Sequence, residues 1–394
     1  VLTATAAAQQ KPLTEQTALQ LGLAREPVQQ RVEGRIAEAQ SEVIAAQILP
    51  NPELSYERDA LNNDEDLVEQ KLVVSRPFDF SGRRALYRDA ADQHLDAARH
   101  ESAAWLADLT RDIRERYYMA LQQQARKQVY AKTQQRVEAL GKALQKRRRE
   151  GDVSLYDYQR VITERAVIVA EAANSQLDFD TAWQSLWVLL GENVQEFQSL
   201  DGTLLPGQPA PLEQLAAALD QQPALLQLDA QTTAWSLQQR AESRTFPEVT
   251  LGLGLRRDET SNRSDNGLVL QASVPLPVSD TRRDKRARFE AQAKVAQSDY
   301  QLAYDRAGAE LRGLWQEATQ YRQRSTDFRE AAVGPAQELI EITEAYYRAG
   351  EVGILELLDA YRGALEAELK ALELEHRARS ASIKLDHLTG GTVQ

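Results

Sequence analysis

The chain of 394 residues has no cysteine and a single methionine. Without cysteine we expect no disulfide, no thiolate metal site and no lipid anchor on a cysteine. The redox compartment stays open, because an envelope protein need not contain disulfides. One methionine cannot form a ladder of thioether ligands for soft metals. The histidines are His94, His100, His376 and His387, and they show neither an HExxH motif nor another spacing typical of metal ligands. The sequence therefore predicts no metal site.

Long apolar runs and enzyme signatures are also missing. No segment reaches about 18 apolar residues, so no transmembrane helix is expected. If the protein lies in a membrane, β-strands would have to cross the bilayer. The net charge of -12 argues against nucleic acid as a partner and suits the passage of cations or neutral solutes. No phosphate-binding glycine loop or nucleophile elbow occurs. We expect neither an enzyme nor a bound cofactor.

Glycine and proline are scarce over long stretches, which predicts unusually long helices. From Gly82 to Glu150 there is no proline and only Gly141 in the interior. At 1.5 Å per residue this stretch would be about 100 Å long. The return limb from Ser154 to Leu190 and the segment near the C-terminus carry apolar stripes at helical spacing, namely Trp183, Leu186, Trp187 and Leu190, then Leu358, Tyr361, Leu365, Leu369 and Leu372.

A tandem repeat covers the chain. The sequence REGDV around Gly151 recurs as RAGEV around Gly350, at an offset of 199 residues, and the same offset relates Gly191 to Gly390. Three further pairs keep the order at offsets of 195 to 199, namely Pro27 with Pro223, Pro52 with Pro247, and Arg83-Arg84 with Arg282-Arg283. Pro335 has no counterpart near Arg136, so we expect a bend or helix end in the second half only.

The repeat sets the expected organisation. Each half runs helix, two strands, long helix, turn and helix, and a linker without a counterpart joins the halves. The expected segments are an N-terminal segment with the first helix (1–50), a β-hairpin (51–79), a long helical hairpin (80–191), the linker (192–222), a helix (223–247), a second β-hairpin (248–277), a second helical hairpin (278–390) and a tail (391–394).

The two predicted hairpins alternate apolar with polar or small residues. In the second half, Val249, Leu251, Leu253 and Leu255 precede the polar stretch 258–266, which we predict to be the turn, and alternation resumes from Leu268 to Val274. In the first half the predicted turn is 59–66. A half-buried hairpin of a soluble protein explains each pattern equally well. Four strands cannot close a barrel, however, and three chains would supply twelve.

This duplicated layout resembles the TolC-type outer-membrane efflux proteins. The resemblance spans residues 11–390, and its most specific pieces are NPEL (51–54), RPFDFSGRR (76–84) and AYYRAGEVGILELLDAYR (345–362). These pieces look most like the channel subunits of heavy-metal (cobalt–zinc–cadmium type) efflux systems. The resemblance implies a mainly α fold in which three protomers form a periplasmic α-barrel and complete a 12-stranded outer-membrane β-barrel.

The resemblance also implies the functional residues. A periplasmic gate would comprise Asp157, Tyr347, Glu356 and Asp359, with Glu356 standing where an aspartate is common. The tips that dock the adaptor would be Gly151, Asp152 and Val153 with Gly350, Glu351 and Val352. Because Glu356 and Asp359 are three residues apart on one helix face, threefold symmetry would gather six carboxylates into a cation-selective ring. Ordinary solvated helix faces also carry such pairs.

The expected function is a passive exit duct of a tripartite efflux system. Its partners would be two further copies of the chain, a periplasmic adaptor, an inner-membrane RND transporter and outer-membrane lipid, and its cargo would be metal cations. Alternatives are a multidrug or type I secretion duct, a soluble coiled-coil scaffold and, less consistent with the duplication, the adaptor itself. The run Ala6-Ala7-Ala8 resembles the end of a cleaved signal peptide, so we expect export, and the family resemblance implies the outer membrane of a Gram-negative bacterium as the destination.

Overall fold

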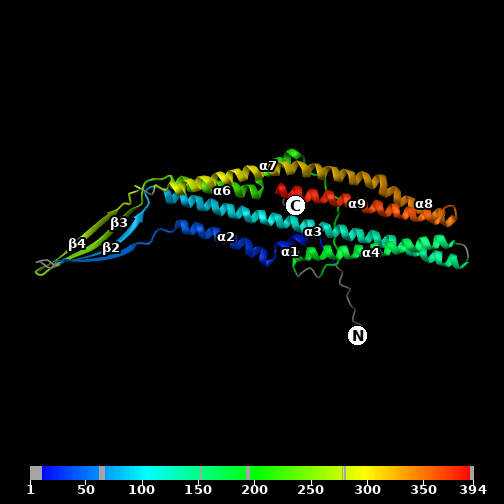
Figure 1. The fold of residues 1–394 in the computed structure, drawn as a ribbon, viewed down its shortest axis with the longest axis horizontal. Helices are drawn as coiled ribbons and strands as arrows, with labels where there is room; N and C mark the ends of the chain where they lie inside the picture. Colours follow the sequence, from blue (N-terminus) through cyan, green and yellow to red (C-terminus); the bar gives the residue numbers. More distant parts are fainter. Residues whose placement is uncertain are drawn as a thin grey trace, which may run out of the picture. The chain divides into compact units, whose positions relative to one another are not determined.

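The computed structural model describes residues 11–61, 67–150, 153–191, 196–276, 278 and 281–390. As the sequence predicted, the fold is mainly helical with four antiparallel strands (Figure 1). The chain forms two compact units. The first contains 1–31, 104–222 and 305–394, and the second contains 32–103 and 223–304. The long helices α3 (Arg83–Glu150) and α7 (Arg283–Phe328) contribute to both units.

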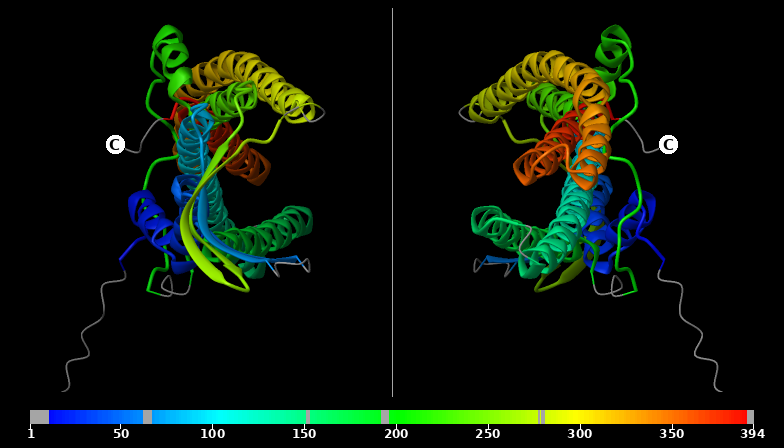
Figure 2. Two further views of the ribbon diagram at one scale, coloured as in Figure 1. Left: turned by 90° about the vertical axis from the view of Figure 1, so that its left-hand side faces the viewer. Right: turned by 90° about the vertical axis from the view of Figure 1, so that its right-hand side faces the viewer.

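The second unit contains one sheet in the order β1-β2-β3-β4. The strands are β1 (Glu53–Leu61), β2 (Leu67–Phe78), β3 (Val249–Thr260) and β4 (Arg263–Ser273). The two hairpins join through an antiparallel β2–β3 ladder that runs from Val68 opposite Glu259 to Phe78 opposite Val249. The strands are strongly twisted (Figure 2).

The predicted turns were too long. Most of the polar stretch 258–266 belongs to β3 and β4, and the ladder continues until Thr260 pairs with Arg263. Likewise β1 continues through Asp59 to Leu61. Polar residues that alternate along a strand satisfy their backbone groups in the ladder as well as apolar ones do, so hydrophobic alternation alone placed the strand ends too early.

One face of the sheet is apolar and exposed. The leucines on this face are 43% to 84% exposed, and Tyr56 and Val74 are exposed beside them. The leucines are Leu54, Leu72, Leu251, Leu253, Leu255, Leu268 and Leu270. The opposite face is polar, with Glu69 in contact with Lys71 and Arg256. On that face Val73 is buried, because it packs over Gly252 and Gly254 on β3.

Four helical segments complete the second unit: α2 (Glu26–Gln47), the first part of α3, α6 (Pro223–Glu242) and the first part of α7. Segment 1–50 thus holds two helices, since α1 (Glu15–Leu23) precedes α2. Ala39, Leu95 and Ala98 pack between α2 and α3. On the other side of α3, the ring of His94 lies edge-on to Trp235 of α6, with centroids 4.8 Å apart.

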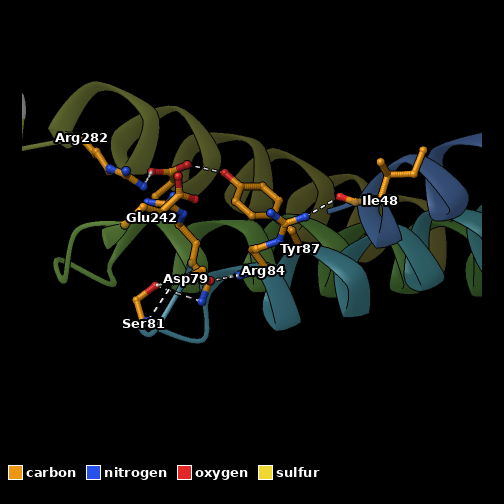
Figure 3. A network of polar contacts seen from close by, with 9 residues as sticks. Ile48, Asp79, Ser81, Arg84, Tyr87, Glu242 and Arg282 are labelled. Carbon is orange, nitrogen blue, oxygen red and sulfur yellow. Dashed lines mark hydrogen bonds and ion pairs between the residues drawn. The ribbon is translucent and has the colours of Figure 1, made fainter. Parts of the chain in front are cut away.

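A polar network holds the start of α3, where the sequence reads RPFDFSGRR (Figure 3). Asp79 accepts hydrogen bonds from the backbone N–H groups of Ser81 (2.9 Å), which precedes α3, and of Arg84 (2.8 Å) in its first turn, where N–H groups lack partners within the helix. The Tyr87 hydroxyl donates to the buried carboxylate of Glu242 on α6, and Arg282 lies 3.6 Å from the same carboxylate.

The two halves enter their long helices in the same way. Gly82 precedes α3 with φ +73°, and Arg282 precedes α7 with φ +57°. Aligned on these helix starts, the halves differ by 200 residues, one more than the sequence offset suggested. Arginine adopts the left-handed region at a cost of about 1 kcal/mol, and its contact with Glu242 helps to offset that cost.

The first unit is an assembly of helices around several apolar clusters. The largest cluster lies among α1, α3, α4 (Leu155–Leu190) and α9 (Ile354–Leu388), and includes the buried Tyr117 and Leu186. Both predicted stripes are buried or half-buried. No helix among the described residues is both long enough and apolar enough to cross a membrane.

The halves differ at Pro335, as predicted. Helix α7 ends at Phe328, a π-helical turn covers Arg329–Val333, and α8 (Gly334–Ala349) begins with Pro335 in its first turn. Proline lacks an N–H group and clashes with the carbonyl four residues earlier, so the regular ladder cannot pass through it. Helix α3, without such a proline, continues unbroken from Arg83 to Glu150.

The linker between the halves is held by side chains from three long helices. Gln124 of α3 exchanges two hydrogen bonds of 2.9 Å with the backbone of Leu200. Arg379 of α9 donates to the carbonyl groups of residues 203–205 at 2.8 to 3.0 Å. Trp315 of α7 donates to the carbonyl of Ala210. Leu13 also pairs with Leu200 in a parallel bridge. Two short helices follow, α5 (Leu212–Ala218) and η2 (Leu219–Gln221).

Candidate functional site

The turn between α8 and α9 is built around Gly350. Its φ of +79° and ψ of +17° are left-handed, and its N–H donates to the carbonyls of Tyr346 and Tyr347. The N–H of Glu351 also returns to Tyr346, at 2.9 Å. This is a Schellman-type helix end, which requires a residue that tolerates positive φ. The sequence motif around Gly350 therefore encodes a sharp reversal between two helices.

The matching turn in the first half lies partly outside the described residues, because Gly151 and Asp152 are not among them. Helix α4 begins at Leu155 with Ser154 as its cap. The Ser154 hydroxyl accepts the N–H of Asp157 at 3.0 Å and donates to the Asp157 carboxylate at 2.7 Å. Asp157, predicted as a gate residue, thus has a local role in capping its own helix. Val153 packs against the neighbouring apolar cluster.

Glu356 and Asp359 lie together on one exposed face of α9. With Arg160 of α4 and Arg362 of α9 they line an open cavity of about 380 Å³. The intervening Leu357 and Leu358 are buried in the helix packing, so the carboxylates are presented on the opposite side of α9. The structure brings two of the three predicted carboxylates to one surface, whereas Asp157 is engaged by Ser154.

An ion pair that the sequence analysis missed links α9 to α4. Arg362 donates to Glu164 over 2.6 Å, and the Glu164 side chain is only 12% exposed. The charge patterns of α4 and α9 indicated that such an ion pair could form. Arg160 and Glu164 are four residues apart on α4, and Asp359 and Arg362 are three apart on α9, so each helix presents both signs of charge on one face. Facing helices with such patterns can pair across their contact.

Tyr347 contacts the end of α3. The guanidinium of Arg147 lies 5.6 Å from its ring centroid, and Arg148 lies 4.6 Å from the ring of Tyr158 on α4. The basic end of α3 therefore makes cation–π contacts with aromatic rings on α4 and α8. Nearby, burial raises the pKa of Tyr361 above its ordinary value, and its hydroxyl donates to Glu344 at 2.8 Å.

Among the described residues, no group of three or more His, Asp or Glu side chains could hold a metal ion. His94 and His376 lie in half-buried positions where burial lowers the pKa, which favours the neutral imidazole.

The chain is similar in sequence to known proteins. Residues 215–391 match the family profile described as "Outer membrane efflux protein". The chain is 23% identical, over 386 residues, to the cobalt-zinc-cadmium resistance protein CzcC of Cupriavidus metallidurans, which covers 96% of this chain and 90% of that protein.

Solved structures show the same fold. The outer membrane protein VceC from Vibrio cholerae superimposes with a TM-score of 0.76 at 19% identity, covering 96% of this chain and 97% of that chain. A membrane protein from Pseudomonas aeruginosa gives 0.76 at 18% identity, covering 95% and 92%. Family members are non-enzymatic transport channels that form trimers in tripartite efflux systems. Residues 215–391 thus match the outer membrane efflux protein family, and the chain as a whole has the fold of these solved membrane proteins.

Proposed function

We propose that three copies of this chain form an efflux duct that passively conducts metal cations from an inner-membrane RND transporter and a periplasmic adaptor to the exterior. The observation that carries this proposal is the four-stranded sheet with one exposed apolar face and one charged face. Within the described residues its outer strands, β1 and β4, each pair on one side only. A single chain leaves both edges open, which lipid does not tolerate.

Pooling the sheets of three copies would solve this problem. Pairing β4 of one copy with β1 of the next gives a closed twelve-stranded sheet without free edges. The apolar face would meet lipid, and the face with Glu69, Lys71 and Arg256 would line the passage. The assembly thereby assigns an environment to each face that suits its side chains.

The metal cargo is supported by two observations. The relative from Cupriavidus metallidurans is named a cobalt-zinc-cadmium resistance protein. The chain is acidic, with a net charge of -12, and Glu356 and Asp359 are exposed on α9. Repeated by threefold symmetry, these carboxylates would form a ring that attracts cations and must be held closed by ties such as Arg362–Glu164.

The adaptor would dock on the helix turns. Glu351 is exposed and Val352 half-exposed at the turn of the second half. Large apolar side chains beside both turns are also exposed, with Leu155 at 59%, Tyr156 at 68% and Leu355 at 45%. Exposed apolar residues at a helix turn favour contact with another protein. Val153 and Gly350, together with these residues, form the proposed docking surface.

A strain that lacks this gene, complemented with the wild-type gene or an empty vector, tests the cargo. We expect the wild-type gene to restore resistance to cobalt, zinc and cadmium salts but not to a panel of hydrophobic drugs. Restored drug resistance alone would favour a multidrug duct instead. Fractionation tests the location separately. Protein that is released from membranes by buffer or high salt would contradict the channel and favour a scaffold.

A further inference from the structure

A row of polar side chains crosses the otherwise apolar face of the sheet. The ladder places Arg58, Gln70, Arg257 and Asn266 opposite one another on β1, β2, β3 and β4. The next row toward the helices is Tyr56, Leu72, Leu255 and Leu268. Successive side chains alternate between faces, so both rows lie on the same face, about 7 Å apart along the strands. The apolar face therefore ends abruptly at a row with two guanidinium groups.

The two arginines of this row, Arg58 and Arg257, are not fully neutralised by carboxylates of the described residues. Within the described part of the chain, Arg58 makes no hydrogen bond or ion pair, and Arg257 only reaches Glu259 at 4.0 Å. The adjacent Arg256, on the opposite face, is well paired, at 2.8 Å from Asp258 and 3.2 Å from Glu69. A chain with an excess of acidic residues thus has two poorly neutralised cations beside its apolar face.

A cavity of about 340 Å³ lies where the two rows meet. Its lining combines the apolar Leu72 and Leu255 and the ring of Tyr56 with the polar Gln70, Arg257 and Asn266, and Lys71, Arg256 and Gly267 also border it. The Tyr56 hydroxyl lies 3.4 Å from the Gln70 side-chain oxygen. The cavity offers hydrocarbon contact on one side and anion-binding donors on the other, which is the pattern of an amphiphile with an anionic head.

We propose that this row binds the phosphate groups of lipids in the outer leaflet, with the adjacent acyl chains in contact with Leu72 and Leu255. The proposal rests on the proposed function, because it requires the apolar face to meet lipid and the hairpin turns to face the exterior. Arginine matches phosphate with two parallel N–H donors, and an amide on either side can add further donors. Tyr56 occupies the boundary position that aromatic residues favour at membrane interfaces.

The experiment uses the full-length purified trimer in detergent. Lipid A, a bisphosphorylated glycolipid, is titrated in mixed micelles, and bound lipid is counted by native mass spectrometry. The test variant is Arg58→Gln with Arg257→Gln. The matched control is Arg286→Gln with Arg288→Gln, which removes the same number of charges from two exposed arginines of α7 that do not line the cavity. Dephosphorylated lipid A and inorganic phosphate are the comparison ligands.

We expect the double variant to bind lipid A at least about tenfold more weakly, because charge-assisted hydrogen bonds are lost, and the control to bind like the wild type. Equal binding by the double variant would overturn the proposal, as would equal affinity for the dephosphorylated lipid. Displacement of lipid A by inorganic phosphate at matching concentration would assign the row to free phosphate. If the trimer conducts in bilayers without binding lipid A, only this inference fails. If it does not insert at all, the proposed function fails.

Discussion

The guanidinium of Arg362 on α9 lies 2.6 Å from the carboxylate of Glu164 on α4, across two helices that belong to different halves of the duplicated sequence. If this pair helps to hold the gate closed, Arg362→Gln should increase single-channel conductance in planar bilayers. Glu164→Gln should have the same effect, and the double variant should add little, because each change removes the same contact.

The control for this cycle is Arg377→Gln. Arg377 pairs with Glu373 at 2.6 Å within α9 and donates to the Tyr321 hydroxyl on α7 at 3.2 Å, so its contacts among the described residues stay within the second half. An exposed pair within one helix contributes about 0.5 kcal/mol or less, so conductance should not change. A conductance increase in this control equal to that in Arg362→Gln would argue against a specific tie.

The second prediction concerns Glu356 and Asp359. Asp359→Asn combined with Glu356→Gln should reduce the preference for cations over anions, because the open conformation loses six carboxylates in the trimer. Reversal potentials measured across a salt gradient report that preference. Glu338→Gln, an exposed change on α8, provides the control. An unchanged reversal potential in the double variant would place the two carboxylates outside the conducting path.

Gly350 should resist substitution for conformational reasons. Its φ is +79° and no heavy atom lies within 4 Å of an added Cβ, so Gly350→Ala would introduce backbone strain without a clash. We expect a loss of about 1 kcal/mol in stability. Gly313→Ala, in the middle of α7 with open space around it, should instead stabilise by about 0.5 to 1 kcal/mol. Thermal unfolding followed by circular dichroism would compare them, and equal shifts of the same sign would contradict the assignment.

Gly254 tests the packing of the sheet. An added Cβ would collide with the Leu72 carbonyl and lie 2.8 Å from the Cα of Val73, so neither backbone can give way. Gly254→Ala should therefore reduce the yield of assembled trimer in membranes. Gly267→Ala, on β4 with nothing within 4 Å of the added atom, should leave it unchanged. The ratio of trimer to monomer on unheated gels measures the effect.

The fifth prediction concerns pH. Burial alone raises the pKa of Asp79, but hydrogen bonds from the Ser81 hydroxyl and the N–H groups of Arg84 and Ser81 outweigh it and hold the pKa below its ordinary value. A lowered folded-state pKa contributes stability above the unfolded-state pKa, near 4, and loses it as the pH falls through the folded-state value.

Asp79→Asn should thus lower stability by about 1 kcal/mol at pH 7, in line with the loss of a charged helix cap, and by less at about pH 3, where the wild-type carboxylate is itself becoming protonated. Asp299→Asn, an exposed change on α7, is the control. The melting temperature at each pH reports the difference. An equal deficit at both values would show that the Asp79 carboxylate charge has no role in the cap.

The sequence predicted the helices, the hairpins and the interruption at Pro335 because each depends on local pattern. It placed the strand ends too early, since polar residues such as Asp258 and Asp265 pair across β3 and β4. At the candidate site the family resemblance implied Glu356 and Asp359, and their spacing predicted that the two share one helix face. It missed Arg362–Glu164, because a contact between residues 198 apart leaves only a faint charge pattern in each helix. The predicted gate and docking residues remain predictions.

The hydrogen bonds that hold the linker have a consequence for the symmetry of an assembly of three chains. Two tandem copies in each of three chains would, if alike, generate six equivalent hairpins around the axis. Gln124, Trp315 and Arg379 hold a segment that occurs only once in each chain. Because of that segment, neighbouring helical hairpins in the assembly have different contacts, so the sequences of the two hairpins can change independently. The two helical hairpins of each chain therefore have different surroundings, although they come from the same repeat.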